Sequence, residues 1–419
     1  MNIITISYKN LKAKPLSAIL NLVLFATGIF IISFLLLLKT QFENHFQKNI
    51  AGVNLVVGAK GSPLQLILSS IFHVDYPTGN ILLADAEKLK HNPLIKQTIP
   101  LALGDNYQGF RIVGTNHDYA TLYNGALETG GLWKNDFDVT IGAKVAEIAG
   151  LKIGDHFAGV HGFMAEGGDK HNEFQYRVTG IFKETGTVLD QLILTNISSV
   201  WQIHSHHHHH DGDGDADEDE GDGHHEESFA GEHHEEADTA REITSLLVFF
   251  RNPMGAISLP RNINKHTNMQ AASPAIEINR LYSLMGIGIQ SVNLIAFVII
   301  LISGFSIFIS LFNSMKERKY ELALMRVMGG GKAKLFTIII LEGLFIAIAG
   351  FIVGFMFSRI GILIISGYAE NNFHYSLSTL FTGKDDLLLF LSSVGVGFLA
   401  SLLPALKAMR TDISKTLAE

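Results

Sequence analysis

The stretch LSAILNLVLFATGIFIISFLLLL, residues 16–38, decides the fold of this chain. It holds no charged residue, and with Pro15 it gives 24 residues, enough for a helix to cross the hydrocarbon core of a bilayer. Three further apolar runs follow, and helices of soluble domains rarely exceed about 20 residues without a charge. The sequence therefore predicts a membrane protein with four transmembrane helices, at residues 15–38, 281–315, 335–358 and 387–406.

The composition agrees with this prediction. The 419 residues are 47% hydrophobic and only 17% charged, which excludes a disordered chain, and the lack of cysteine excludes a disulfide scaffold. The first apolar run is longer than the core of a secretory signal, about 7–15 residues, and no small-residue cleavage site follows it. We therefore expect an uncleaved membrane anchor.

The distribution of lysine and arginine predicts the orientation. These residues cluster in segments 1–14, 316–334 and 407–419, and short cytoplasmic loops retain positive charge. We expect these three segments, with both chain termini, in the cytoplasm. Segments 39–280 and 359–386 are then extracytoplasmic.

Segment 39–280 is long enough for one or two globular domains. It contains short runs typical of strands, such as FRIVGT from Phe110 and SLLVFF from Ser245, and helical runs such as AKVAEIAG, which Gly150 would end. The mixture predicts an α+β domain inserted between the first two transmembrane helices. The sequence lacks GxGxxG and GxxxxGK[ST] phosphate loops and the GxSxG, HExxH and CxxC motifs, so it gives no enzyme signature.

Within this domain, segment 204–238 holds 10 His and 14 acidic residues and no lysine or arginine. Without these 14 acids the formal charge of −8 becomes +6. Such a composition cannot bury a core, so we expect a disordered insertion. Imidazole and carboxylate groups suit Zn²⁺ and similar ions. The candidate ligands are His204, His206, His207, His208, His209, His210, His224, His225, His233 and His234.

Two other interpretations of this tract stay open. It can be a solvated linker that binds metal incidentally, because the spacing of a dedicated tetrahedral site is missing. It can also respond to pH, since ten imidazoles with an ordinary pKa of about 6.5 gain charge on mild acidification.

The segment 316–334, KERKYELALMRVMGGGKAK, joins the second and third transmembrane helices. Its spacing predicts an amphipathic helix that ends at three glycines. The apolar stripe comprises Tyr320, Leu324, Val327 and Met328, and the polar side carries Glu317, Arg318, Glu321 and Arg326. A basic helix lying on anionic lipid is the alternative, but such a helix would not need the two glutamates.

The block ERKYELALMRVMGGGKAKL from Glu317 resembles the cytoplasmic elbow of the FtsX-like or MacB-like permeases of ABC transporters. The ending LLPALKAMRTDISKTL from Leu402 is similar to the C-terminus of the same family, and in the 39–280 segment VTIGAKVAEIAGLKIGD and FQYRVTGIFKETGTVLD are similar as well. The three glycines depart from the single Gly-Ala that often follows the elbow helix. The histidine-rich tract is no general feature of the family.

This resemblance implies a permease dimer in the bacterial inner membrane, paired with two separate ATPase subunits that bind ATP. The elbow would be the coupling helix. The closing motion of the ATPases would be passed to the extracytoplasmic domain, a mechanism called mechanotransmission. That domain would act on a lipoprotein, peptide or other amphiphile. Membrane lipids and a periplasmic protein are further expected partners, whereas nucleic acid is not. We expect no cofactor in this chain apart from Zn²⁺ or a similar metal at the histidine-rich tract.

The third transmembrane helix contains Glu342, and acids inside a membrane usually serve function. The nearby boundary lets Glu342 reach water or pair with Lys332 or Lys334, and a role in coupling or dimer contact is one hypothesis. For the whole chain, one alternative is the same machine devoted to zinc or another transition metal. Another is a membrane-anchored metal sensor without an ATPase.

Overall fold

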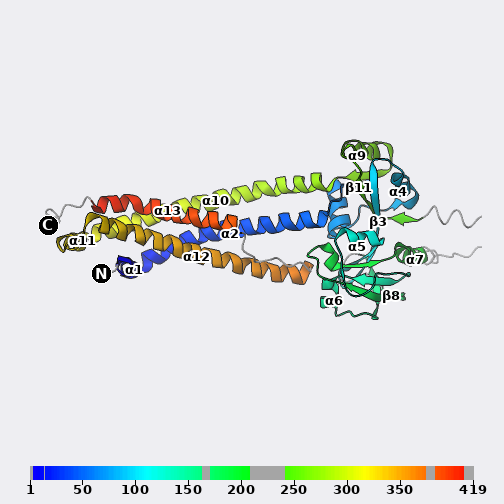
Figure 1. Cartoon of the computed structure of the whole chain (residues 1–419), viewed down its shortest axis with the longest axis horizontal. Helices are drawn as coiled ribbons and strands as arrows, with labels where there is room; N and C mark the ends of the chain where they lie inside the picture. The colour runs from blue at the N-terminus through cyan, green and yellow to red at the C-terminus, as the bar shows by residue number, and fades with distance from the viewer. Residues whose placement is uncertain (1–2, 14, 163–169, 208–240, 374–382, 410–419) are drawn as a thin grey trace, which may run out of the picture. The chain divides into compact units, whose positions relative to one another are not determined.

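The computed structural model of the chain describes residues 3–13, 15–162, 170–207, 241–373 and 383–409 (Figure 1). The chain divides into two compact units, Met1–Glu43 with Ser283–Glu419, and Asn44–Tyr282. We call the first the membrane unit and the second the inserted domain.

The membrane unit is helical. Its helices are α1 (Ile3–Ala13), α2 (Pro15–Ile50), α10 (Pro274–Glu317), α11 (Lys319–Val327), α12 (Lys332–Phe373) and α13 (Lys384–Met409), and the outer ends of α2 and α10 belong to the inserted domain. Among the described residues, four helices are long and apolar enough to cross a membrane, namely α2, α10, α12 and α13. The prediction of four transmembrane helices is thereby confirmed.

These helices extend beyond the apolar runs that predict them. Helix α12 continues to Phe373, so the first part of the expected 359–386 loop is helical. The apolar sequence GILIISGY follows Arg359 after one residue, and the Arg359 guanidinium donates to the Asp386 carboxylate of α13 over 2.6 Å. Because the Arg359 charge is paired with a carboxylate, its side chain does not have to reach water. Helix α12 can therefore continue past Arg359.

Small residues let the membrane helices approach closely. A Cβ added at Gly343 of α12 would lie 3.0 Å from the carbonyl oxygen of Gly397 in α13, and one at Gly354 would lie 2.4 Å from that of Ala26 in α2. The hydroxyls of Ser33 in α2 and Ser358 in α12 lie 2.9 Å apart. Close backbone contact and hydroxyl pairs are the interactions that hold helices together in lipid.

The inserted domain is built on mixed β-sheet. Its strands are β1 (Leu55–Ala59), β2 (Ile81–Leu82), β3 (Ile95–Tyr107), β4 (Phe110–Gly114), β5 (Leu127–Gly130), β6 (Asp138–Ile141), β7 (His156–His161), β8 (Lys170–Phe182), β9 (Leu192–Thr195), β10 (Glu242–Ile243), β11 (Ser245–Phe250) and β12 (Met269–Ala272). Ten of them form one sheet in the order β12-β1-β11-β3-β4-β9-β6-β8-β5, with β7 beside β3 and β8. The pairs β4–β9 and β6–β8 are parallel and the other pairs are antiparallel.

Short helices cover this sheet. They are α3 (Pro63–Ile67), which continues as a π-helical turn over Leu68–Phe72, α4 (Leu83–Lys90), α5 (His117–Leu122), α6 (Ala143–Ala149), α7 (Ile197–His207) and α9 (Met254–His266), together with a 3₁₀ turn over Val188–Gln191. The α+β prediction is confirmed. The strand runs at Phe110 and Ser245 form β4 and β11, and Gly150 ends α6 with a left-handed φ of 68°.

The edge strand β12 is protected against further strand pairing. Asn264 of α9 donates its amide to the carbonyl of Ala271, and its side-chain oxygen accepts from the Ala271 N–H over 2.6 Å. The Asn264 side chain thus takes the place of a neighbouring strand, which is one way for a protein to keep a sheet edge from recruiting another chain.

Candidate coupling site

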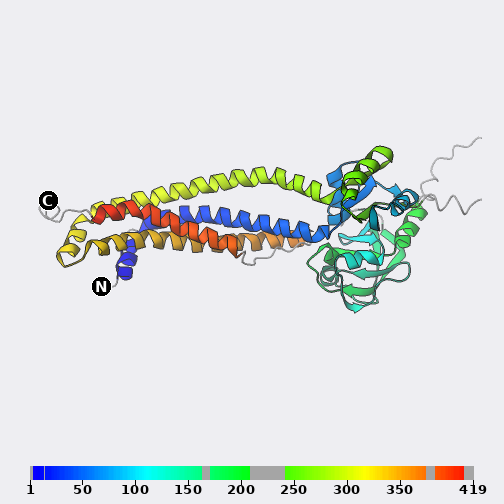
Figure 2. The same cartoon turned by 45° about the horizontal axis from the view of Figure 1, so that its top comes forward.

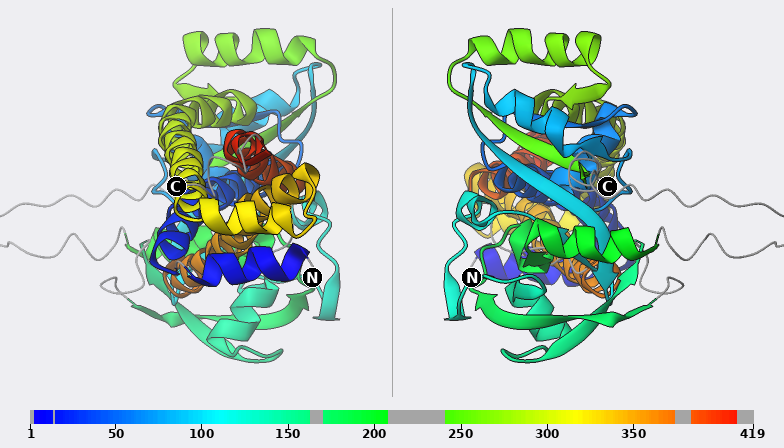
Figure 3. Two further views of the ribbon diagram at one scale, coloured as in Figure 1. Left: turned by 90° about the vertical axis from the view of Figure 1, so that its left-hand side faces the viewer. Right: turned by 90° about the vertical axis from the view of Figure 1, so that its right-hand side faces the viewer.

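Helix α11 forms the elbow between α10 and α12. It ends at Val327, and Gly329 then adopts a φ of +91°, which side chains other than glycine rarely allow. A Cβ at Gly330 would lie 2.6 Å from the carbonyl oxygen of Met325. The expected helix end at the three glycines is confirmed, with Gly329 supplying the turn and Gly330 the close approach. Figures 2 and 3 show that α11 runs across the long helices of the membrane unit.

The elbow helix turns one apolar face inward and leaves a second exposed. Leu322 and Ala323 are buried, and Leu322 packs in the apolar core of the membrane unit. The stripe expected from the sequence lies on the other side: Tyr320, Leu324, Val327 and Met328 are 62%, 44%, 59% and 71% exposed. The described residues of this chain therefore leave this stripe uncovered.

The polar residues of the elbow divide into two groups. Glu317 and Glu321 are exposed and Arg326 is half-buried, whereas the Arg318 side chain is only 19% exposed. Arg318 donates from Nε to Oε2 of Glu321 over 2.8 Å, and one terminal nitrogen lies 3.6 Å from Oε1 of Glu342. Arg318 thus links the start of α11 to α12.

Glu342 is buried, with 4% of its surface exposed. Its Oε1 accepts a hydrogen bond from the Asn10 amide over 2.6 Å, so its partners are Asn10 and Arg318 rather than the expected Lys332 or Lys334. The lysines lie in the first turn of α12, two or more turns before Glu342, whereas Arg318 and Asn10 come from outside that helix. The glutamate therefore joins α1, the start of α11 and α12.

Sequence reasoning missed the contribution of α1. Ser7 donates from Oγ to the carbonyl of Ile338 over 3.1 Å, one turn before Glu342. Ser7 and Asn10 are three residues apart and so share one helix face. The spacing of these two polar residues could have indicated that this face of α1 makes contacts. It could not have identified α12 as the helix that they contact.

The ends of α2 and α10 that belong to the inserted domain are fixed in its core. Phe46 of α2 packs edge-to-face on Phe72 and on Tyr282 of α10, with ring centroids 4.8 and 5.8 Å away. Asn49 of α2 is fully buried, and its carbonyl accepts from the Tyr123 hydroxyl over 2.9 Å. Both helices are therefore rooted among buried side chains of this domain.

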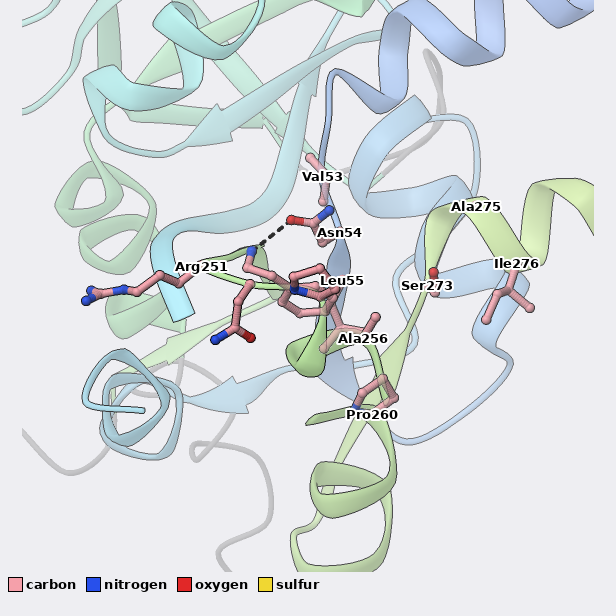
Figure 4. Close-up of a pocket in the computed structure, with 12 residues that line it drawn as sticks. Val53, Asn54, Leu55, Arg251, Ala256, Pro260, Ser273, Ala275 and Ile276 are labelled. Atoms are coloured by element: carbon pink, nitrogen blue, oxygen red, sulfur yellow. Dashed lines mark hydrogen bonds between the residues drawn. The ribbon is translucent and has the colours of Figure 1, made fainter. Parts of the chain in front are cut away.

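The inserted domain also carries an open groove of about 500 Å³ between β1, the end of β11, α9 and the start of α10 (Figure 4). Its lining is mostly apolar, including Val53, Ala256, Pro260 and Ile276. In Figure 4 the Arg251 side chain extends away from the other labelled residues. The groove thus offers mostly apolar walls, and Asn54, Arg251, Asn252 and Ser273 add the polar part of its lining.

Seven of the ten candidate metal ligands lie outside the described residues. His204, His206 and His207 belong to α7, while His208, His209, His210, His224, His225, His233 and His234 lie outside the described residues. Within the described ranges there is no group of three or more His, Asp or Glu side chains able to hold a metal ion.

Comparison with known proteins bears on the membrane unit. Residues 293–413 match the family described as FtsX-like permease C-terminal. No curated protein matches the chain. The periplasmic region of MacB from Actinobacillus actinomycetemcomitans is 12% identical with a TM-score of 0.33, and covers 56% of this chain and 97% of its own. The extracellular domain of the noncanonic ABC-type transporter YknZ from Gram-positive bacteria is 13% identical with a TM-score of 0.30, and covers 52% and 100%. Because both TM-scores are below 0.5, we infer nothing about this chain from these two structures.

The chain is thus a multi-pass membrane protein in which a mixed α/β domain separates the first two transmembrane helices. Its residues 293–413 match the FtsX-like permease domain, which confirms the resemblance seen in the elbow sequence. Such a domain indicates a transporter permease rather than a catalytic enzyme.

Proposed function

We propose that this chain is the permease subunit of an ABC transporter and that α11 is its coupling helix. The observation that carries the proposal is the exposed stripe of Tyr320, Leu324, Val327 and Met328 on a helix anchored to the membrane unit by Arg318. Exposed apolar side chains in a cluster mark surfaces that bind another protein or a membrane, and the two glutamates of α11 favour a protein. The partner is a separate ATPase subunit, two copies of which serve a permease homodimer.

Both termini and α11 then lie in the cytoplasm of a bacterial cell, with the inserted domain outside the inner membrane. This orientation rests on the lysine and arginine clusters around α1, α11 and the C-terminus. Motion at α11 reaches the inserted domain along α2 and α10, the two helices whose ends pack on each other through Phe46 and Tyr282. This is mechanotransmission without passage of a substrate through a channel.

The substrate class is a lipoprotein, a peptide or another amphiphile. The groove of Figure 4 supports this class because its apolar walls suit an acyl chain or apolar side chains. A second candidate function, handling of zinc or a similar metal, rests on the ten histidines of segment 204–238.

Co-purification of the ATPase subunit with the full-length permease tests the proposal. Val327→Asp puts a charge into the exposed stripe and is expected to abolish co-purification. Val74→Asp is the matched control, because Val74 is 65% exposed and belongs to the inserted domain. Glu317→Lys tests the polar side of the elbow in the same assay. Undiminished co-purification in both elbow variants would refute the coupling role.

A further inference from the structure

Helix α1 runs across the long helices of the membrane unit, as Figures 2 and 3 show from two directions. It ends at Ala13, and the first transmembrane helix begins at Pro15. Amphipathic helices with lysine on the polar face lie in the plane of the membrane surface.

The faces of α1 differ in chemistry. Ser7 is buried and Leu11 packs against the core of the membrane unit. On the exposed side, Ile4 and Tyr8 are 55% and 62% exposed, and they lie four residues apart on one strip of the helix.

A basic strip lies beside this apolar strip. Lys9 and Lys12 are exposed and three residues apart, and α1 contains no acidic residue. Neither lysine takes part in an ion pair with any residue that the structure describes. The exposed side of α1 therefore presents an apolar and aromatic strip together with two cations.

We propose that α1 binds anionic phospholipid, with Ile4 and Tyr8 at the acyl boundary and Lys9 and Lys12 on the lipid phosphates. Tyrosine favours the headgroup level of a bilayer, and each lysine close to an anionic leaflet adds to the attraction. The long lysine side chains can reach the phosphates while the helix axis stays at the boundary. A soluble anion would satisfy the two lysines but would leave Ile4 and Tyr8 in water, so the apolar strip favours a lipid.

This lipid site is connected to the elbow. The face of α1 opposite the lipid carries Asn10, which donates to Glu342 over 2.6 Å, and Glu342 in turn lies 3.6 Å from Arg318 at the start of α11. Lipid that holds α1 at the surface therefore also holds the partner of Glu342 in place. We expect anionic lipid to stabilise α11, and the consequence for coupling rests on the function proposed above.

Fluorescence quenching tests lipid binding without any ATPase. Tyr8→Trp is made in the full chain, which is placed in nanodiscs containing brominated phosphatidylglycerol or, at equal mole fraction, brominated phosphatidylcholine. Quenching above that of the unmodified chain, which has two tryptophans, reports lipid at position 8. The anionic lipid should quench more strongly. The double substitution Lys9→Gln with Lys12→Gln should remove the difference in quenching between the two lipids. This corresponds to a loss of roughly 30-fold in affinity for the anionic lipid relative to the zwitterionic one.

The control is Lys96→Gln with Lys134→Gln, which removes the same charge from exposed sites of the inserted domain and should leave the difference unchanged. Equal quenching by the two lipids in the Tyr8→Trp chain, which retains Lys9 and Lys12, would overturn the proposal. The two lysines would then show no preference for the anionic lipid. Absence of quenching by either lipid would also overturn it and would show that a protein or water covers this face. Free phosphate added to zwitterionic nanodiscs should not reproduce the effect of the anionic lipid.

Amide hydrogen exchange tests the link to the elbow. Residues 319–328 should exchange several-fold more slowly in anionic than in zwitterionic nanodiscs. Asn10→Ala should abolish this difference while leaving intact the lipid quenching measured on the Tyr8→Trp chain. Equal exchange in the two lipids would overturn the link. Because no ATPase is present, the lipid site and the coupling function can fail independently.

Discussion

The side-chain oxygen of Asn49, one residue before the end of α2, accepts a hydrogen bond from the backbone N–H of Val188 over 2.7 Å. Both groups are buried, and the Asn49 carbonyl also accepts from the Tyr123 hydroxyl. One residue of a transmembrane helix thus holds two separate segments of the inserted domain.

Asn49→Ala should lower the free energy of unfolding of the inserted domain by about 1–3 kcal/mol, because the Val188 N–H would remain buried without an acceptor. Hydrogen exchange of the segment around Val188, measured on the full-length protein in detergent, gives this value. Asn252→Ala, at an exposed asparagine of the same domain, should change it by less than about 0.5 kcal/mol. Equal effects of the two variants would show that the hydrogen bond to Val188 contributes nothing specific.

A second prediction concerns Arg318 and Glu342. Arg318→Met leaves the Glu342 carboxylate buried without its cation and should destabilise the membrane unit by about 3 kcal/mol. Loss of the exposed contact with Glu321 adds little. Adding Glu342→Gln should recover most of the stability, because the amide oxygen can still accept from Asn10.

Thermal unfolding of the two single variants and the double variant in detergent completes a double-mutant cycle. Additive effects of the two substitutions would mean that Arg318 and Glu342 do not interact.

The third prediction is a pH dependence caused by His73. Burial, and secondarily the charge of Arg111, lowers the pKa of His73 from 6.5 to about 3. One ring nitrogen lies 2.9 Å from the Tyr119 hydroxyl. The unfolded chain takes up a proton near pH 6.5 and the folded chain does not, so the stability from the neutral ring is complete above pH 6.5 and is lost as the pH falls toward 3.

At about pH 5 this group should cost the inserted domain about 2 kcal/mol relative to neutral pH. His73→Asn should remove this contribution and leave that of His45, whose pKa burial lowers from 6.5 to about 4. Asparagine tolerates the left-handed φ of 54° found at this position. His91→Asn replaces an exposed histidine and should not change the profile. A profile that keeps its slope in His73→Asn would assign the pH dependence to other groups.

The fourth prediction tests the groove. Ala256→Trp places an indole among Val53, Pro260 and Ile276 and should reduce binding of a fluorescent acylated peptide to the full-length protein at least several-fold. Lys134→Trp introduces the same side chain at an exposed site away from the groove and should leave binding unchanged. Unimpaired binding in Ala256→Trp would place the amphiphile elsewhere.

Much of the architecture could be predicted from the sequence because it depends on local patterns. The four apolar helices follow from run length, and Gly150 and Gly329 mark helix ends through their left-handed φ. The order of strands in the sheet could not be predicted, since β1 pairs with β11 and β12, which lie far along the chain beyond the histidine-rich tract. Pairing at that distance depends on complementarity that no local pattern records.

The candidate site was predictable only in part, for the same reason. The stripe of α11 is periodic and could be read from the sequence, but periodicity does not say which of two apolar faces packs inward, and Leu322 and Ala323 do so. One partner of Glu342, Asn10, comes from α1, 332 residues away. An asparagine in a short helix carries no sequence signal that names such a partner.

The last prediction concerns the histidine-rich tract. Replacing residues 208–238 by a short Gly/Ser linker should leave the inserted domain folded, since Ile203 of α7 is buried against its core before the tract begins and β10 resumes at Glu242. Its free energy of unfolding without metal should change by less than about 0.5 kcal/mol. Calorimetric titration of Zn²⁺ into the full-length and replaced chains then separates the interpretations. Zinc binding that disappears with the tract and alters ATP turnover of the reconstituted complex would assign metal to the function. Binding that disappears without any change in turnover would make the tract an incidental ligand. Binding that survives the replacement would exclude the seven histidines of 208–238 as the principal site.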